Sequence, residues 1–428
     1  MSKVMVYGYG ESGQWSEKLL RSKGYNVTIV DDKKGLHKEL AIGVLEDHAF
    51  MVVSPGILPS NPLIQIAKRM GMRVISEIEL ANLYYKGNII AVTGTNGKTS
   101  TVSMITQLLS RAGFSAASAG NEWIPFTQIV VENRKYDYLV LEVSSQQLEN
   151  TESLKPLISA ITTLSPDHME RYKTPEDYYN EKLKIFRNTS TKAHHLINSD
   201  LAYLKSRYVN SNAHKLTFSL NKEADISLKD NFIYFKDEKI LDTTKLDIAF
   251  KQFISNFMIV VGVSKILNID NKILQEVVYN FPRLEHRVEK FLDNSRGLFL
   301  NDSKATNIEA TQAVLESFEE SPILICGGKD KHLDLESFVS KISSKIDSVL
   351  LIGELTDKLY DLFRKKCVEE KIFKCYNLDN AINTLDKILF SKKIVLFSPA
   401  SASFDQFDSF EHRGKEFKRK IIERFKNV

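Results

Sequence analysis

Cysteine is scarce in this sequence. Its 428 residues include three cysteines, Cys326, Cys367 and Cys375, and their spacing matches no metal-binding pattern. An odd number does not favour a disulfide framework, so we expect a reducing, cytoplasmic environment. No apolar run reaches the roughly 18 residues that a membrane-spanning helix needs. A strand pattern begins at Val4 without the charged and apolar segments of a signal peptide, so none is expected.

No sign of charge dominates either. The chain has 58 basic and 54 acidic residues, which gives a net charge of +4. This near balance gives little support for a nucleic-acid or membrane partner, although local basic pockets for phosphate remain compatible with it. Hydrophobic residues make up 43% of the sequence, which excludes a disordered chain. A chain of this length can form about two to four domains with substantial cores.

The most informative stretch follows an apolar, strand-like run that begins at Ile89. A glycine turn, Gly94-Thr95-Asn96-Gly97, comes next, and a helix is expected from Lys98 to about Ala112. Glycines let backbone N–H groups surround an anion, the helix start and Lys98 add positive charge, and the Thr99 hydroxyl can hold Mg²⁺. The pattern predicts a nucleotide-triphosphate site in a compressed form of the usual loop. The alternative is a surface turn with an incidental Gly-Lys-Thr.

A second glycine turn lies near the N-terminus. The strand pattern Val4–Tyr7 precedes Gly8–Gly13, which has the form G-x-G-x-x-G, and a further strand ends at Asp31. This arrangement is typical of dinucleotide-binding folds and predicts a diphosphate at the turn and a sugar near the acid. It does not specify the nucleotide, so an NAD-dependent dehydrogenase is one alternative. Another strand candidate ends in Ser54-Pro55-Gly56, which is either a ligand contact or an ordinary turn.

The middle of the chain places polar residues after further strand candidates. Glu142 ends the apolar run Tyr138–Leu141, where a carboxylate can hold Mg²⁺ or act as a cap. His168 follows another strand, and ligand and structural readings stay open for it. Composition alone indicates a solvated surface position for Lys182. Residues 215–248 alternate in a way that predicts a small satellite sheet.

The last third of the chain alternates strands and helices again. Each predicted strand ends in polar or small residues that would meet at one edge of a parallel sheet and suit an acidic substrate or a phosphate. The predicted strands are Leu298–Leu300, Ile323–Cys326, Ser348–Ile352 and Ile394–Phe397.

Taken together, these motifs resemble the Mur ligase family of ATP-dependent amide ligases over essentially the whole chain. The ATP loop is shared with folylpolyglutamate synthases, whereas the other segments are similar to those of the D-glutamate-adding members, most specifically the last two. The segments are Gly94–Thr99, Glu142–Glu149, Asp167–Tyr172, Asn301–Asn307 and Ser398–Phe407.

The resemblance implies an α/β protein of three domains, each on a mostly parallel sheet. Residues 1–88 would form a Rossmann-like domain for a UDP-linked substrate, 89–283 a P-loop-type ATP domain, and 284–428 a Rossmann-like domain for D-glutamate. The implied reaction joins D-glutamate to UDP-N-acetylmuramoyl-L-alanine through an acyl phosphate, in peptidoglycan precursor synthesis for the cell wall. ATP and two Mg²⁺ ions are implied, and a cytoplasmic monomer is expected. Another Mur ligase or a folylpolyglutamate synthase is the nearest alternative, and a catalytically silent nucleotide-binding module is a more distant one.

The resemblance also assigns residues by motif. It places ATP on Gly94, Thr95, Asn96, Gly97, Lys98, Thr99 and Ser100, with further nucleotide contacts from Asn256, Arg287, Asp302 and Lys304. It places the UDP-substrate on Ser12, Asp31, Gly56, Asn121, Ser144 and Gln147, and D-glutamate on Thr306, Lys331, Ser403 and Phe410. Magnesium ligands would be Thr99, Glu142, His168 and, if carbamylated by CO₂, Lys182. Catalytic roles fall to Lys98, His168 and Lys182.

One segment departs from the family pattern. Where the family has H-N-x-x-N, this chain reads Gln252-Phe253-Ile254-Ser255-Asn256. Only Asn256 is retained, and Phe253 replaces the family asparagine. Any adenine or ribose contact made by that asparagine is therefore not expected here.

Overall fold

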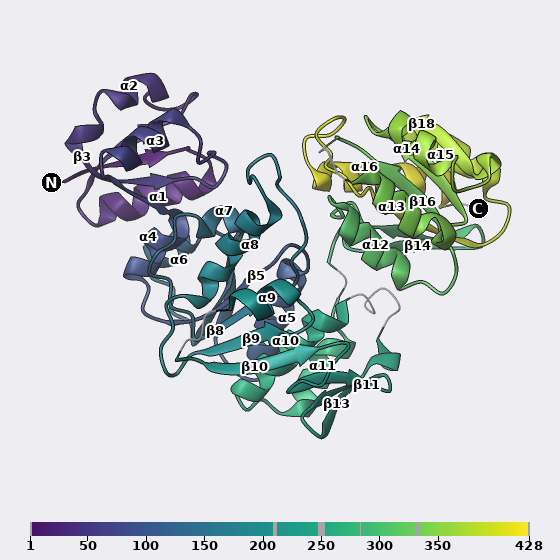
Figure 1. The fold of residues 1–428 in the computed structure, drawn as a ribbon, viewed down its shortest axis with the longest axis horizontal. Coiled ribbons are helices and arrows are strands. Elements are labelled where there is room, and N and C mark those ends of the chain that lie inside the picture. Colours follow the sequence, from purple (N-terminus) through teal and green to yellow (C-terminus); the bar gives the residue numbers. More distant parts are fainter. Residues whose placement is uncertain (1, 209–211, 247–252, 283, 331–333, 427–428) are drawn as a thin grey trace. The chain divides into compact units, whose positions relative to one another are not determined.

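Three sheets organise the chain in the computed structural model, which describes residues 2–208, 212–246, 253–282, 284–330 and 334–426 (Figure 1). The α/β fold that the sequence predicts is confirmed. The chain divides into two compact units, the first comprising Met1–Thr243 with Ile254–Asn280 and the second Thr244–Phe253 with Phe281–Val428. The first unit holds two of the sheets. The domain boundaries at 88 and 283 stay predictions, and residue 283 lies outside the described residues. Among the helices of the described ranges, none is long and apolar enough to cross a membrane.

The N-terminal sheet has four parallel strands in the order β2-β1-β3-β4. Alternate residues of β1 belong to two different cores, because helices cover both faces of the sheet. Helices α1 and α4 supply one core, and α2 and α3 the other. The elements are β1 (Lys3–Tyr7), α1 (Glu11–Ser22), β2 (Asn26–Val30), α2 (Lys38–Ile42), β3 (His48–Val53), α3 (Pro62–Arg69), β4 (Arg73–Ser76) and α4 (Glu77–Tyr84).

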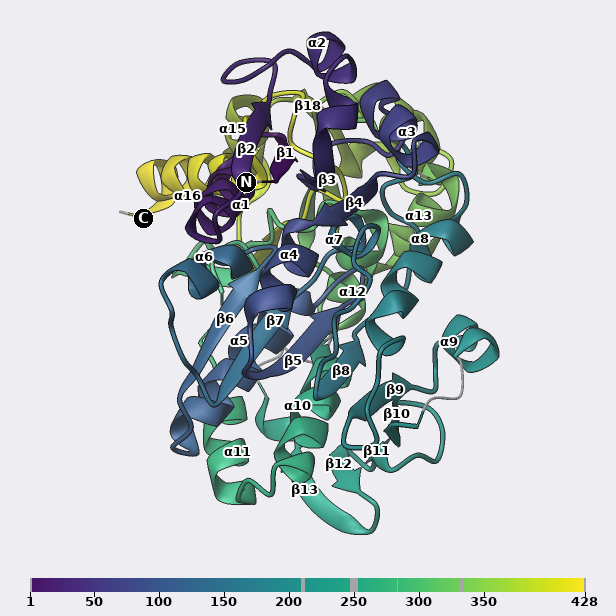
Figure 2. The ribbon, with the colours of Figure 1, turned by 90° about the vertical axis from the view of Figure 1, so that its left-hand side faces the viewer.

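The central sheet has nine strands in the order β13-β12-β11-β10-β9-β8-β5-β7-β6 (Figure 2). Its strands are β5 (Asn88–Thr93), β6 (Ala116–Gly120), β7 (Tyr138–Glu142), β8 (Ile158–Ile161), β9 (His194–Asn198), β10 (His214–Ser219), β11 (Ile226–Lys229), β12 (Phe232–Phe235) and β13 (Glu238–Asp242). Its helices are α5 (Lys98–Arg111), α6 (Phe126–Val131), α7 (Ser145–Leu148), α8 (Pro175–Leu183), α9 (Ala202–Arg207), α10 (Ile254–Ile266) and α11 (Asn271–Tyr279).

The expected satellite sheet does not exist as a separate sheet. Strand β10 pairs in parallel with β9, from His214 opposite His194 to Phe218 opposite Asn198, so β10–β13 extend the main sheet. An unpaired edge strand exposes a row of backbone groups, and β10 satisfies those of β9. The alternating pattern predicts that strands are present, but it does not say which edge they pair with.

The buried residue Glu77 links α4, a helix of the N-terminal sheet, to α6, a helix of the central sheet. Its carboxylate, at the start of α4, accepts hydrogen bonds from Thr127 N at 2.5 Å and Thr127 Oγ1 at 2.7 Å, at the start of α6. Burial raises the pKa of Glu77 from its ordinary value to about 6.

This raised pKa predicts a pH dependence of stability. As pH rises, Glu77 ionises at a lower pH in the unfolded chain than in the folded protein. The folded state therefore loses stability relative to the unfolded state between about pH 4.5 and pH 6. At about 1.4 kcal/mol per pKa unit, the free energy of unfolding should fall by about 2 kcal/mol over this window, relative to Glu77→Gln. Urea unfolding of both proteins at pH 4, 5, 6 and 7 measures the difference. Parallel curves for the two proteins would show that Glu77 titrates normally.

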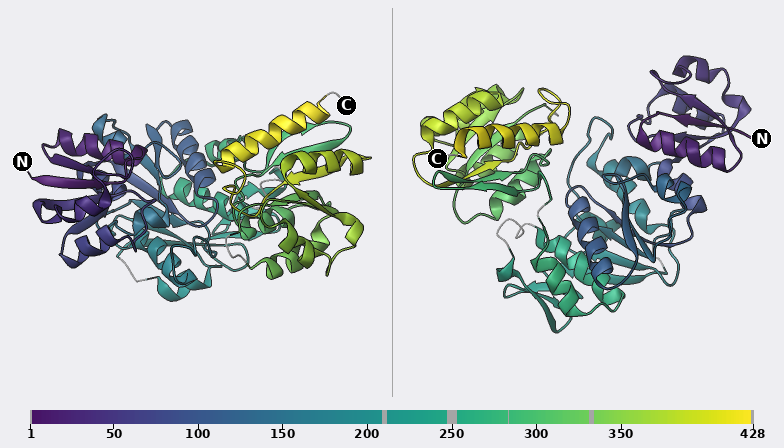
Figure 3. Two further views of the ribbon diagram at one scale, coloured as in Figure 1. Left: turned by 90° about the horizontal axis from the view of Figure 1, so that it is seen from above. Right: turned by 180° about the vertical axis from the view of Figure 1, so that it is seen from behind.

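The C-terminal sheet has the order β14-β15-β19-β16-β17-β18, and only β14 is antiparallel to its neighbour. Helices α12, α13 and α14 cover one face, and α15 and α16 cover the other, with α16 drawn in yellow in Figure 3. The four predicted strands are confirmed, and β14 and β18 were not predicted. The elements are β14 (Glu289–Asp293), β15 (Gly297–Asn301), α12 (Ile308–Glu316), β16 (Ile323–Gly327), α13 (Leu335–Ile342), β17 (Ser348–Ile352), α14 (Thr356–Phe363), β18 (Ile372–Tyr376), α15 (Leu378–Ile388), β19 (Lys393–Phe397) and α16 (Phe410–Phe425).

Candidate active site

The predicted triphosphate loop connects β5 to α5, and its backbone requires glycine at two positions. Gly94 and Gly97 have φ of 146° and 85°. A Cβ at Gly94 would lie 1.9 Å from Thr162 Oγ1, and one at Gly97 would lie 2.5 Å from Asn256 Nδ2. Since α5 begins at Lys98, the loop carries the positive end of a 14-residue helix.

The two side chains after the loop are held in place by neighbours. Lys98 Nζ donates to the carbonyl oxygens of Gly94 and Thr95, each at 3.0 Å. Thr99 Oγ1 donates to Glu142 Oε1 at 3.3 Å. The loop lysine, the loop hydroxyl and the carboxylate at the end of β7 therefore lie together, as the sequence predicts.

Glu142 is fully buried and accepts hydrogen bonds from the neutral side chains of Thr99, Asn121 and Trp123. Asn121 Nδ2 and Trp123 Nε1 donate to its two oxygens at 3.2 and 3.0 Å. Asn121 comes close because Gly120 pairs with Glu142 across β6 and β7. Trp123 was not predicted, since nothing in the sequence around it indicates this contact. A buried carboxylate beside a threonine hydroxyl is an oxygen donor set that suits Mg²⁺.

Lys182 lies beside the loop between β5 and α5. The prediction from composition that it lies at the surface is wrong. The residue is 1% exposed, and its Nζ donates to the carbonyl oxygen of Gly94 at 2.8 Å. Burial, and then the charge of Lys98, lower the pKa of Lys182 well below its ordinary value, against the opposing charges of Asp167 and Glu142. The ammonium lies 4.4 Å from the ring centroid of Tyr178. Helix α8 thus places a buried amine against the triphosphate loop.

His168 is positioned by a tight turn after β8. Its φ is 57°, its Nδ1 lies 3.2 Å from Glu170 Oε1, and its ring centroid lies 6.1 Å from that of Tyr178. Tyr178 in turn contacts both Lys182 and Thr95. The structure therefore brings His168 to the edge of the loop region. The metal-ligand role of His168 stays a prediction.

Asn256, the retained asparagine of the divergent segment, packs on Gly97. The side chain is buried, and its Oδ1 has no hydrogen-bond partner among the described residues. A buried acceptor without a partner is costly unless a ligand completes it. Gln252, at the other end of the segment, lies outside the described residues.

The N-terminal glycine turn is closely packed. A Cβ at Gly13 would lie 2.1 Å from the carbonyl oxygen of Gly8, so only glycine fits. Asp31 accepts hydrogen bonds from the backbone N–H groups of Tyr9, Lys33 and Lys34 at 2.9 to 3.2 Å, and these N–H groups, that of Lys33 foremost, lower its pKa. Asp31 thus holds the turn as a carboxylate. Its predicted contact with a ligand, and those of Ser12 and Gly56, stay predictions.

Ser144 and Gln147 engage each other in a capping box at the start of α7. Ser144 Oγ accepts from Gln147 N, and Gln147 Oε1 accepts from Ser144 N. This reciprocal pair explains their positions without a ligand. The predicted contacts of Ser144 and Gln147 with the substrate stay predictions.

In the second unit, the predicted residues Asp302 and Lys304 follow β15, and Ser403 follows β19. Asp302 is buried, accepts from Ser398 Oγ at 2.8 Å and Val288 N at 3.2 Å, and has a pKa raised by burial to about 7. Lys304 Nζ lies 3.7 Å from the ring centroid of Phe410. The predicted residues Arg287, Thr306 and Ser403 belong to the same unit, whereas Lys331 lies outside the described residues.

Arg413 is a buried residue of this region that the sequence did not reveal. From α16 it donates to Ser303 Oγ at 3.0 Å, the Ser303 carbonyl at 2.8 Å and the Ser401 carbonyl at 2.9 Å. It is 1% exposed. The guanidinium therefore ties the loop after β15 to the loop after β19.

Removing this guanidinium should destabilise the second unit. Arg413→Met leaves buried acceptors on Ser303 and Ser401 without a donor, so we expect the free energy of unfolding to fall by about 3 kcal/mol or more. Urea unfolding measures the change. Arg419→Met is the matched control, because Arg419 lies on the same helix but pairs with Glu416 and Glu423 at the surface. Equal midpoints for the two variants would contradict the prediction.

Comparison with known proteins identifies the architecture. Residues 92–270 match the family model described as Mur ligase middle domain, and residues 286–401 match the Mur ligase, glutamate ligase domain. A UDP-N-acetylmuramoylalanine--D-glutamate ligase from Fusobacterium nucleatum is 38% identical, over 99% of this chain and 100% of its own length. The chain belongs to the Mur ligase family.

A further relative agrees with that assignment, and two solved structures share the fold. A protein of the same description from Aquifex aeolicus is 35% identical over 98% of both chains. Among solved structures, UDP-N-acetylmuramate-alanine ligase MurC from Thermotoga maritima shares the fold with a TM-score of 0.62 at 16% identity, covering 100% of each chain. MurF ligase from Thermotoga maritima, solved in complex with ADP, gives a TM-score of 0.63 at 17% identity and covers 95% of this chain and 97% of its own.

Proposed function

We propose that this Mur ligase joins D-glutamate to UDP-N-acetylmuramoyl-L-alanine with conversion of ATP to ADP and phosphate, in peptidoglycan precursor synthesis. The observation that carries the proposal is the meeting of Lys98, Thr99, Glu142 and Lys182 at one end of α5. A glycine loop with a lysine, a hydroxyl and a buried carboxylate provides groups that phosphoryl transfer uses. The full-length likeness to D-glutamate ligases supports the choice of substrates.

The chemistry follows from the difficulty of amide formation in water. Near pH 7 the L-alanyl carboxyl is ionised, and its oxygen is a poor leaving group. An oxygen of this carboxylate attacks the γ-phosphorus of ATP, the bond to the β-phosphate oxygen breaks, and ADP leaves. The D-glutamate amine then bonds to the acyl carbon, loses a proton, and phosphate departs. Lys98 supplies positive charge where the transferred phosphoryl group gathers negative charge, and the loop fixes its position.

Magnesium would be held by Thr99, Glu142 and His168, and a second ion by Lys182 if its amine carries a carbamate. Bound ions would neutralise phosphate oxygens and orient them for transfer. The buried, hydroxyl-paired Glu142 fits such a role, because its hydrogen-bonded environment holds the carboxylate in a fixed direction.

The other roles are proposed by position. The UDP-substrate would contact Ser12, Asp31, Gly56, Asn121, Ser144 and Gln147. ATP would also contact Ser100, Asn256, Arg287, Asp302 and Lys304. D-Glutamate would contact Thr306, Lys331, Ser403 and Phe410. The monomeric state and the cytoplasmic location stay predictions.

A phosphate-release assay tests the proposal. With ATP and Mg²⁺, release should require both UDP-N-acetylmuramoyl-L-alanine and D-glutamate, and mass spectrometry should show the amide product. Replacing D-glutamate by L-alanine or meso-diaminopimelate, or replacing the UDP-substrate by a folate with L-glutamate as the amine, separates this activity from other ligases of the superfamily. Product formed only with one of those acceptors would reassign the substrate, and no ATP consumption under any condition would reject the function.

A further inference from the structure

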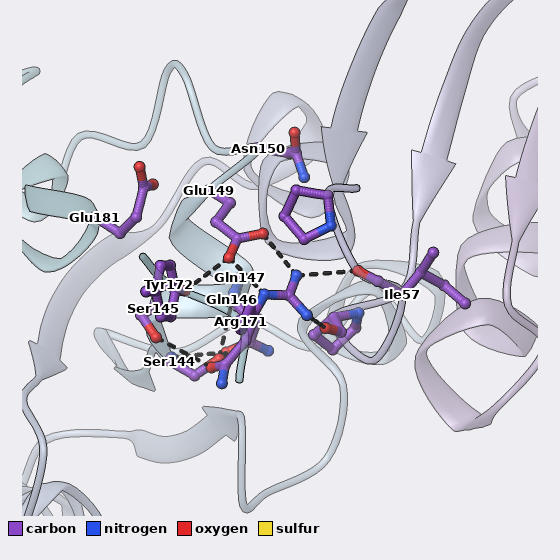
Figure 4. Close-up of polar contacts among 12 residues, drawn as sticks. Ile57, Ser144, Ser145, Gln146, Gln147, Glu149, Asn150, Arg171, Tyr172 and Glu181 are labelled. Carbon is purple, nitrogen blue, oxygen red and sulfur yellow. Dashed lines mark hydrogen bonds and ion pairs between the residues drawn. The ribbon is translucent and has the colours of Figure 1, made fainter. Parts of the chain in front are cut away.

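A buried ion pair joins the central sheet to the turn that follows β3. Arg171 and Glu149 form a bidentate pair, with Nε to Oε1 and Nη2 to Oε2 both at 2.6 Å. Their side chains are 6% and 9% exposed. Figure 4 shows the guanidinium of Arg171 between the carboxylate of Glu149 and the backbone at Ile57. An ion pair taken this far out of water needs further hydrogen bonds to offset its desolvation.

Those further bonds define what the pair holds. Arg171 Nη1 donates to the carbonyl oxygen of Pro55 at 2.9 Å, and Nη2 donates to that of Ile57 at 3.0 Å. The two carbonyls flank Gly56, an exposed residue whose Cβ position has no atom within 4 Å. One guanidinium therefore fixes both sides of a single exposed glycine.

The opposite side of the pair is fixed to the candidate active site. Arg171 N and Tyr172 N both donate to the carbonyl oxygen of His168, at 2.8 and 3.1 Å, so Arg171 belongs to the His168 turn. Tyr172 Oη donates to Glu149 Oε1 at 2.7 Å, and Lys184 Nζ donates to the Glu149 carbonyl at 2.9 Å. Glu149 itself ends α7, whose first turn carries the Ser144–Gln147 capping box.

We propose that Arg171 is a positioning residue for the UDP-substrate. It holds the Pro55–Ile57 turn in a fixed position relative to the His168 turn and to α7. The inference rests on the proposed function, in which Gly56, Ser144 and Gln147 contact the UDP-substrate. The rigid fork of the guanidinium suits this task, because it can bond a carboxylate and two carbonyls at once in fixed directions. The UDP end of the substrate is thereby held at a set distance from the phosphate loop.

A simpler role must be separated from this one, namely adhesion between the first two sheets. Arg73 offers the comparison, because it also links them through an ion pair: it bonds Glu79 on α4 and Glu152, which follows α7 in the chain. Within the described residues, the Arg73 side chain forms no hydrogen bond or ion pair with the Pro55–Ile57 turn. Arg73→Met is therefore the matched control for Arg171→Met.

The test measures binding and turnover in the full-length enzyme. For Arg171→Met we expect the Kd and KM for UDP-N-acetylmuramoyl-L-alanine to rise about tenfold or more, because a preorganised contact surface is lost. The KM values for ATP and D-glutamate should stay within about twofold of the wild type, as expected when only binding of one substrate is affected. Calorimetric titration without ATP gives the Kd, and initial rates give the KM values.

Two further variants keep the test decisive. Arg171→Lys preserves the charge beside Glu149 but cannot reach both carbonyls, so its KM for the UDP-substrate should rise as well, and it decides the matter if Arg171→Met does not fold. Arg73→Met should leave this KM unchanged. The inference is overturned if both folded Arg171 variants keep the wild-type Kd, or if Arg73→Met raises it equally. Failure of the wild type to bind or ligate the UDP-substrate would instead reject the proposed function itself.

Discussion

Lys98→Ala is expected to lower the turnover number at least about a hundredfold, corresponding to about 3 kcal/mol of lost transition-state stabilisation. The ammonium sits at the start of α5, 3.0 Å from the carbonyl oxygens of Gly94 and Thr95, inside the loop that is proposed to hold the phosphates. Charge develops on the transferred phosphoryl group, and a fixed cation there acts without reorganisation. Phosphate release under saturating substrates measures the effect.

The same variant should bind the UDP-substrate normally, since Lys98 lies outside the proposed UDP site. Lys192→Ala controls for the loss of one positive charge, because Lys192 is an exposed lysine in the same predicted domain. Thermal unfolding of both variants checks that Lys98→Ala folds, which matters because its Nζ also bonds two loop carbonyls. Turnover within about threefold of the wild type would exclude a role for Lys98 in phosphoryl transfer.

Several of the strands that the sequence predicts share one feature, and its absence explains why β6 was missed. Strands such as β5 and β16 are short apolar runs buried on both faces, and each ends at a polar or glycine-containing loop. Strand β6 reads Ala-Ala-Ser-Ala-Gly and lacks the apolar run that would predict a strand. Its pairing with β7 nevertheless places Asn121 beside Glu142. Its small residues serve packing, which becomes visible only in three dimensions.

The candidate site was predictable to the extent that it lies at strand ends. Thr99, Asn121 and Glu142 meet because parallel neighbours place their carboxyl ends at one edge. Arg171 and Arg413 were missed for a different reason. Each bonds backbone carbonyls of segments distant in the chain, and a carbonyl carries no sequence signature. Lys182 was misplaced by composition for the same cause, because its partner is the carbonyl of Gly94.

Lys182→Met is the second variant for which a loss of at least about a hundredfold in turnover is expected. Burial, and then the charge of Lys98, lower the pKa of Lys182 well below its ordinary value although Asp167 and Glu142 oppose the shift, and the hydrogen-bond partner of its amine is the neutral carbonyl of Gly94. A neutral amine can attack the carbon of CO₂ and release a proton, which forms a carbamate. That product would convert the side chain from a cation into an anion with oxygen donors, beside the proposed site of the phosphates. Methionine preserves the length of the chain and can form no carbamate.

Lys182→Arg separates the carbamate from the positive charge alone, since a guanidinium keeps the charge and does not take up CO₂ in this way. If Lys182 works as a cation, arginine should restore much of the turnover that methionine loses; if it works as a carbamate, arginine should be as inactive as methionine. Carbon-13 NMR after incubation with labelled bicarbonate should then show a carbamate signal in the wild type that is absent from both variants. Activity in Lys182→Arg without that signal in the wild type would leave Lys182 as a conventional cation of the loop, and the second metal position proposed on it would fall.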